Sequence, residues 1–134
     1  MSTAVPCSAE VVVVDDDARI RALLEDELHA RGLSALLCSS VHDLLQLLQN
    51  RSPQLVLLGV RGSDPQQLKE LRLLRGDRLE LPVVVLSADA DATIPERAIA
   101  SGAREVVLKR DLLMRLPQLL AHHLGIETLP EETF

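Results

Sequence analysis

The stretch VVVVDDD, at residues 11–17, decides the fold. Its four valines form a continuous run of β-branched side chains, which is typical of a strand buried on both faces of a sheet. The three aspartates that follow place charge where the strand ends. A strand of this kind belongs to a parallel sheet that is covered by helices on both sides, so we expect an α/β fold.

The same change from strand spacing to helix spacing is repeated along the chain. Further apolar runs predict strands at 33–38, 55–58, 83–86 and 105–108. Apolar residues at helical spacing predict helices over about 20–28, 40–48, 64–74, 93–100 and 116–124. The predicted fold is therefore (βα)5, a doubly wound five-stranded parallel sheet with helices on both faces.

The starts of two helices follow from the chemistry of single residues. Asp64 is expected to cap a helix, with Pro65 in its first position and Gln67 reaching back to the cap as in a capping box. The last helix is expected to begin near Leu116, after an irregular turn. An earlier start would place Pro117 inside the helix, at a cost of about 3 kcal/mol.

The whole chain has the composition of one small globular domain. Of its 134 residues, 47% are hydrophobic and 25% are charged, and we expect a single domain over 9–125 with flexible ends or a linker stub at 1–8 and 126–134. The net charge of −6 and the aromatic content of 1% argue against nucleic-acid and membrane partners. Because the chain also lacks a long apolar run and a signal peptide, a cytoplasmic location is expected.

The residues that directly follow the predicted strands are the ones to read for chemistry, because doubly wound sheets bind ligands at the carboxyl ends of their strands. Asp15 and Asp16 follow the first strand, Gly59 lies at the end of the third, Ser87 follows the fourth and Lys109 follows the fifth. This pattern resembles the receiver domain of bacterial two-component response regulators. The motifs that carry the resemblance are VVVVDDD at 11–17, PQLVLLGV at 53–60, LPVVVLSA at 81–88 and GAREVVLK at 102–109.

The resemblance implies a strand order of 2-1-3-4-5 and a role for each position. Receivers are phosphorylated on an aspartate at the end of the third strand, where this chain has Gly59. Two acids after the first strand help to hold Mg²⁺, and they match Asp15 and Asp16. The remaining matches are Ser87 and Lys109, which would contact the phosphoryl group, and Val106, which stands where receivers have an aromatic switch residue.

The departure at Gly59 decides the functional interpretation. Glycine has no carboxylate, so no acyl phosphate can form there and one Mg²⁺ ligand is lost. No resident cofactor is expected, although Asp15 and Asp16 could hold Mg²⁺ weakly with waters. Val106 also lacks the ring that reports phosphorylation. We therefore expect a degenerate pseudo-receiver that is not an enzyme.

The leading hypothesis is a protein-protein interaction module that acts without phosphorylation. In the family, the common docking and dimerisation face is formed by the fourth helix, fifth strand and fifth helix, which correspond to about 94–124 here. Arg97, Arg104 and Arg115 are expected to be exposed on it. The partner would be another protein, a neighbouring output domain or a second copy of the chain.

Two alternatives remain open at the sequence level. The first is a phosphorylatable switch with a non-standard acceptor, for which Asp64 is the nearest acid, although a helix cap explains that residue fully. The second is a flavodoxin-like binding protein for a small ligand. The chain lacks both a glycine-rich phosphate cradle and an aromatic residue that could stack on a flavin, which disfavours the second alternative.

Several contacts around the predicted pocket can also be anticipated. Crowded carboxylates need a cation nearby, so Lys109 is expected to pair with Asp15 or Asp16. Arg61 is expected to fill the vacated pocket or to pair with Asp16, and Ser87 to satisfy the backbone of its own loop. All four histidines are expected on the solvated surface: His29, His42, His122 and His123.

Overall fold

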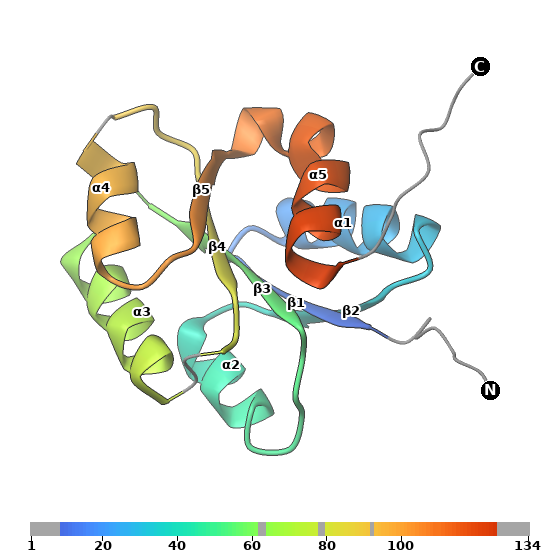
Figure 1. The fold of residues 1–134 in the computed structure, drawn as a ribbon, viewed down its shortest axis with the longest axis horizontal. Helices are drawn as coiled ribbons and strands as arrows, with labels where there is room; N and C mark the ends of the chain where they lie inside the picture. Colours follow the sequence, from blue (N-terminus) through green and yellow to red (C-terminus); the bar gives the residue numbers. More distant parts are fainter. Residues whose placement is uncertain (1–8, 62–63, 78–79, 92, 126–134) are drawn as a thin grey trace.

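Five parallel strands and five α-helices alternate along the part of the chain that the computed structural model describes, residues 9–61, 64–77, 80–91 and 93–125 (Figure 1). The strands are β1 (Glu10–Val14), β2 (Ser34–Cys38), β3 (Leu55–Val60), β4 (Val83–Ser87) and β5 (Glu105–Leu108). The helices are α1 (Ala18–Ala30), α2 (Val41–Leu47), α3 (Pro65–Asp77), α4 (Thr93–Ala100) and α5 (Leu112–Leu124). The ends predicted to be flexible, 1–8 and 126–134, lie outside the described residues.

The sheet has the order β2-β1-β3-β4-β5, and all of its neighbouring strands are parallel. Val12 of β1 lies opposite Leu36 of β2 and Val56 of β3. Every residue of β3 and β4 is buried. The predicted fold class and strand order are therefore confirmed, and the central strands owe their burial to the helices on both sides.

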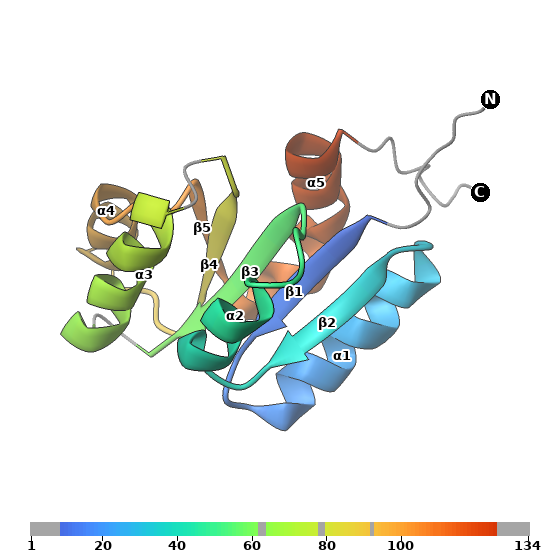
Figure 2. The same ribbon diagram turned by 90° about the horizontal axis from the view of Figure 1, so that it is seen from below.

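Alternate residues of each strand enter two separate cores. Helices α1 and α5 cover one face of the sheet, and α2, α3 and α4 cover the other (Figure 1 and Figure 2). Val11 and Val13 pack with the helices of the first face, whereas Val12 and Val14 pack with those of the second. This period-two alternation is what β geometry requires when both faces are apolar.

Polar side chains hold the amino ends of the helices. Asp17 Oδ1 accepts the Arg19 N–H at 2.9 Å before α1, and Asp64 Oδ1 accepts the Gln66 N–H at 2.9 Å before α3. The predicted cap at Asp64 is therefore confirmed, but the capping box is wrong. Gln67 Oε1 instead accepts the Arg61 N–H at 2.8 Å, so this side chain fixes the loop that follows β3.

Helix α5 begins earlier than predicted. It starts at Leu112, directly after a 3₁₀ turn over Lys109–Asp111, and it contains Pro117. Leu112 and Leu116 are 1% and 0% exposed, and only a helix that includes both can bury them one turn apart. The gain from burying a leucine side chain is about 2 kcal/mol, which offsets much of the cost of the proline. No helix among the described residues is long and apolar enough to cross a membrane.

Candidate functional site

The carboxyl ends of the strands bring together most of the residues that the sequence singled out. Asp15 and Asp16 follow β1, Gly59 lies in β3, and Lys109 follows β5. Together with Arg61 they line a small hollow of about 160 Å³. This is the edge at which doubly wound sheets bind ligands, so it is the first place to ask what chemistry remains.

Asp15 is a buried carboxylate that contacts a cation of the chain. Its side chain is 1% exposed, and its Oδ2 lies 2.8 Å from Lys109 Nζ. Its Oδ1 accepts the Asp17 N–H at 2.9 Å. Oδ2 has no well-aligned hydrogen bond among the described groups, so the contact with Lys109 is a close charge pair. The predicted pairing of Lys109 with one of the two acids is confirmed.

Gly59 has no room for a side chain in this arrangement. A Cβ atom on Gly59 would lie 2.0 Å from Asp15 Oδ2, 2.7 Å from Asp15 Cγ and 3.3 Å from Lys109 Nζ. Real Cβ atoms do not approach other heavy atoms so closely, because the packing of interiors is already near its limit. The Asp15 carboxylate therefore occupies the space into which a side chain at position 59 would project.

Asp16 is also paired with a cation of the chain. Its Oδ2 forms a salt bridge with the Arg61 guanidinium, as predicted. The pair is largely exposed, with 75% of the Arg61 side chain and 49% of the Asp16 side chain accessible, so it contributes at most about 1 kcal/mol to stability. Its effect on the site is electrostatic, because it places a second positive charge beside the acids.

The pocket does not fit a Mg²⁺ ion as the family would hold one. Asp15 is paired with Lys109, Asp16 is paired with Arg61, and position 59 offers no carboxylate. Within the described ranges no group of three His, Cys, Asp or Glu side chains is placed to hold a metal. Mg²⁺ needs oxygen ligands in near-octahedral geometry, and the two cations of the chain compete for the oxygens that remain.

Ser87 and Val106 contact only their own surroundings and not the hollow. The Ser87 hydroxyl donates to the Asp89 carbonyl at 3.0 Å and accepts the Asp89 N–H at 3.1 Å. Ser87 is 1% exposed, so this turn satisfies a buried hydroxyl, as the sequence led us to expect. Val106 is half-buried and packs against the core beneath α2, α3 and α4. Neither side chain lines the hollow.

The three arginines expected on one interaction face do not lie together. Arg115 of α5 pairs with Glu105 of β5, with its Nη2 2.7 Å from Oε2. Arg97 lines a hollow between α3 and α4. Arg104 is exposed just before β5. The sequence could not show which side of α4 carries Arg97, and the interaction face itself stays a prediction.

His123 contradicts the prediction that all four histidines are solvated. Its side chain is 5% exposed, and its Nε2 lies 3.0 Å from Glu105 Oε1. Its ring also contacts that of His122 edge-on, with centroids 4.7 Å apart. The missed signal was its spacing, because His123 lies three and seven residues after the buried Leu120 and Leu116 and so shares their face of the helix.

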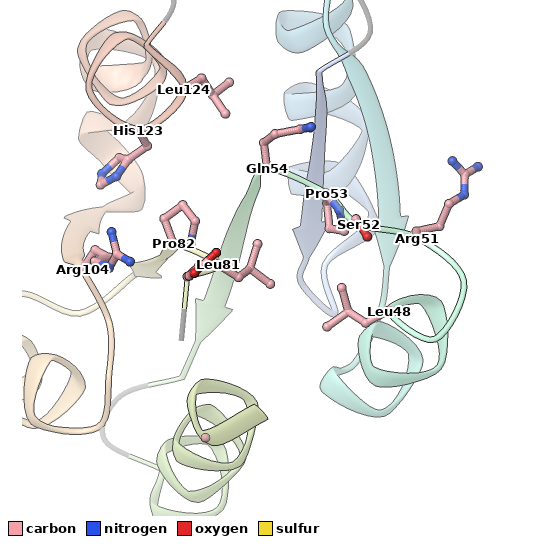
Figure 3. Close-up of a pocket in the computed structure, with 12 residues that line it drawn as sticks. Leu48, Arg51, Ser52, Pro53, Gln54, Leu81, Pro82, Arg104, His123 and Leu124 are labelled. Carbon is pink, nitrogen blue, oxygen red and sulfur yellow. The ribbon is translucent and has the colours of Figure 1, made fainter. Parts of the chain in front are cut away.

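A wider hollow lies at the opposite edge of the sheet and has a volume of about 770 Å³. Figure 3 shows Arg104 and His123 on one side of it and Leu48 and Arg51 on the other. Arg51 is paired with Glu10 at 2.6 Å, and His123 is paired with Glu105. Arg51 and His123 are thus engaged with carboxylates of the chain. The hollow lies at the amino ends of β3 and β4, away from the edge where such sheets bind ligands.

A parallel sheet of order 2-1-3-4-5 with helices on both faces defines a flavodoxin-like α/β domain. Residues 11–121 match the family model described as the response regulator receiver domain, and the chain belongs to this family. It is therefore a receiver domain of bacterial two-component signalling, which is a signalling module rather than a catalytic enzyme.

Relatives and solved structures agree with this assignment. The chain is 29% identical over 99 residues to the DNA-binding transcriptional regulator NtrC of Proteus hauseri, covering 74% of this chain and 21% of that protein. It is 31% identical over 114 residues to the response regulator MprA of Mycobacterium sp. (strain KMS), covering 82% of this chain and 50% of that protein. A response regulator receiver protein from Burkholderia phymatum has a TM-score of 0.76 at 29% identity, covering 90% and 98% of the two chains. The chain thus spans between a fifth and a half of these two curated relatives.

Proposed function

We propose that this chain is an atypical receiver domain that acts without phosphorylation, as a protein-protein interaction or dimerisation module in the bacterial cytoplasm. One observation carries the proposal. The Asp15 carboxylate, held by Lys109, fills the space that a side chain at position 59 would need. The acids of the pocket are thus paired with the chain's own cations, and position 59 offers no carboxylate to accept a phosphoryl group.

The chemistry supports the same conclusion. Phosphotransfer to a receiver requires a carboxylate oxygen as the nucleophile, and Gly59 supplies none. Asp64 is the nearest acid that could replace the missing acceptor. Its carboxylate accepts the Gln66 N–H and so serves as the cap of α3. The shape of the domain is then independent of phosphate donors, and any signal must come from the concentration or the state of its partner.

The proposed surface is the α4–β5–α5 face, residues 94–124, and the proposed occupant is a second copy of the chain or a neighbouring output domain. Ile99 of α4 is 50% exposed, so a large aliphatic side chain of this face is accessible to a partner. Arg115 is held by Glu105 and so presents a fixed guanidinium. Arg104 adds a second positive charge at the amino end of β5.

Exposure to phosphate donors tests the absence of phosphorylation. We expect no mass increase after incubation with acetyl phosphate and Mg²⁺, and no change in the amide spectrum after addition of beryllofluoride and Mg²⁺. A receiver that retains its acceptor aspartate serves as the positive control. Covalent phosphate on this chain would contradict the proposal, and its loss in Asp64→Asn would establish the alternative of a non-standard acceptor.

Sedimentation equilibrium tests the proposed face. If two copies associate through it, Ile99→Glu and Arg104→Glu should each shift the chain toward the monomer. Leu73→Glu on α3 is the matched control, because Leu73 is 59% exposed but lies outside the face. If all three variants and the unmodified chain were monomeric at every concentration, dimerisation would be excluded and only a different partner would remain.

A further inference from the structure

A third hollow lies between α3 and α4, on the side of α4 that faces α3, and it shares no lining residue with the pocket at Gly59. The two helices lie side by side in both views (Figure 1 and Figure 2). The hollow has a volume of about 290 Å³ and is open to solvent. Its lining is Pro65, Leu68 and Arg72 from α3, with Arg97, Ala100 and Ser101 from α4 and its end.

The arginines of α3 are positioned by contacts with the end of α4. Arg72 Nη1 donates to Ser101 Oγ at 3.3 Å, and Ser101 is 4% exposed. One turn further on, Arg75 Nη1 donates to the Gly102 carbonyl at 3.4 Å. A Cβ on Gly102 would lie 2.8 Å from Arg75 Cγ, so glycine allows the stem of this arginine to pack closely there. The two contacts hold the basic side of α3 against α4.

The two arginines of this hollow form no salt bridge among the described residues, although Arg97 lies near enough to Asp91 to help lower the pKa of that carboxyl group. Elsewhere Arg31, Arg51 and Arg115 each lie within 2.8 Å of a carboxylate oxygen. Within the described part of the chain, neither Arg72 nor Arg97 has a carboxylate within salt-bridge distance, and no acidic residue lines the hollow. The whole chain has a net charge of −6, but this hollow carries two guanidinium groups without a salt-bridge partner among the described residues, so its local charge is positive.

We propose that the hollow between α3 and α4 docks an acidic segment of a partner protein. Guanidinium groups suit carboxylates because their planar donors can form paired hydrogen bonds. Carboxylates of the segment would contact Arg72 and Arg97, while a small apolar side chain would rest on Leu68 and Ala100. The inference rests on the proposed function only in assigning a protein partner, and it uses the side of α4 that faces α3, whose lining does not include Ile99, Arg104 or Arg115.

The test is an amide-shift titration of the whole chain with a model peptide. The probe is a short acetylated peptide of alternating glutamate and alanine with one central leucine, and its control has glutamine in place of every glutamate. We expect saturable shifts confined to 65–72 and 97–101 with the acidic probe and none with the neutral one. Arg97→Glu and Arg72→Gln should each weaken binding about tenfold, since each removes one charged contact.

A matched variant separates this site from the general effect of charge. Arg110 is exposed and does not line the hollow, so Arg110→Glu changes the net charge as Arg97→Glu does and should leave binding unchanged. Equal weakening by the two reversals, or no saturable binding of the probe, would overturn the proposal. The proposal would also be overturned if inorganic phosphate, but not the acidic peptide, gave saturable shifts of the same amides, because the site would then recognise a small oxyanion. The phosphate-donor experiment does not involve this surface, so the two proposals fail separately.

Discussion

At the scale of single residues, the acids of the pocket are paired with two cations of the chain itself. Lys109 pairs with Asp15 and Arg61 pairs with Asp16. A charge as deeply buried as that of Asp15 is tolerated only when a partner compensates for its lost hydration. The Asp15–Lys109 pair is therefore a structural part of this domain, and its removal should be costly.

Replacing Lys109 by methionine tests this dependence. Lys109→Met leaves the Asp15 carboxylate buried without its ammonium partner, and we expect the free energy of unfolding to fall by about 3 kcal/mol. Urea unfolding followed by circular dichroism measures the change.

The double variant Asp15→Asn/Lys109→Met is the control. Asparagine keeps an oxygen that can accept the Asp17 N–H but carries no charge, so the double variant should lose less stability than Lys109→Met alone. Equal losses in both variants would mean that packing around Lys109, rather than the charge of Asp15, accounts for the effect.

Gly59→Ala provides a second test at this scale. The added methyl group would overlap Asp15 Oδ2, so the carboxylate must move away from Lys109, and we expect a loss of about 1–3 kcal/mol. Gly76 in α3 is the matched control, because a Cβ there meets nothing within 4 Å, and Gly76→Ala should stabilise the helix by about 0.5 kcal/mol. A neutral effect of Gly59→Ala would show that the pocket is looser than this packing implies.

The sequence predicted part of this site. The matching positions, the missing carboxylate and the pairing of Lys109 with an acid all followed from residue type and order. It could not show that Asp15, rather than Asp16, would fill the space beside Gly59, because that depends on how two adjacent side chains leave the strand end. The role of Gln67 was missed because its amide contacts Arg61 across the loop rather than the helix cap.

At the scale of elements, strands were easier to predict than helix boundaries. A continuous apolar run favours a parallel strand, because a strand that is buried on both faces needs apolar residues at every position. The start of α5 was wrong because the cost of Pro117 was weighed without the burial of Leu112, which is a tertiary effect. The residue that secures α4 was also missed, since Asp91 lies two positions before the first helical residue.

The start of α4 gives a prediction about pH. Hydrogen bonds from the Thr93 N–H and then the Thr93 hydroxyl to Asp91 Oδ1, both at 2.9 Å, lower the pKa of Asp91 below its ordinary value of 3.8. A lowered pKa adds stability above the ordinary value, and this contribution is lost as the pH falls through the lower, folded-state value. We therefore expect Asp91→Asn, which keeps a capping oxygen but does not titrate, to lose less stability than the unmodified chain between about pH 5 and pH 2.

Thermal unfolding across that range measures the difference between the two chains. Asp17 also has a lowered pKa, through its bond from the Arg19 N–H, but it is present in both proteins and cancels in the comparison. Parallel pH profiles for the two chains would contradict the assigned role of Asp91.

At the scale of the whole molecule, the positions that receivers use for phosphorylation and for its readout, here Gly59 and Val106, lie in different places. The acids and Lys109 lie at the carboxyl edge of the sheet, whereas Val106 lies within β5 and packs toward the core beneath α2, α3 and α4. Both places depart from the family pattern, but the departures are structurally independent. A substitution that restores the family residue at one of these two positions should leave the structure at the other unchanged.

Gly59→Asp tests this separation. The new carboxylate must displace Asp15, and the site then contains three acids with Lys109, which is the set that the family uses to hold Mg²⁺ and to accept phosphate. We expect the variant to gain Mg²⁺-dependent modification by acetyl phosphate, seen as a mass increase of one phosphoryl group. Amide shifts on modification should stay near the carboxyl edge of the sheet, because Val106 has no ring to reorient and so does not transmit the change to the α4–β5–α5 face. Amide shifts that extend along α4 and α5 would show that the fold transmits the signal without an aromatic residue. The double variant Gly59→Asp/Val106→Tyr restores an aromatic ring at position 106, and in this variant we expect the amide shifts to reach α4 and α5.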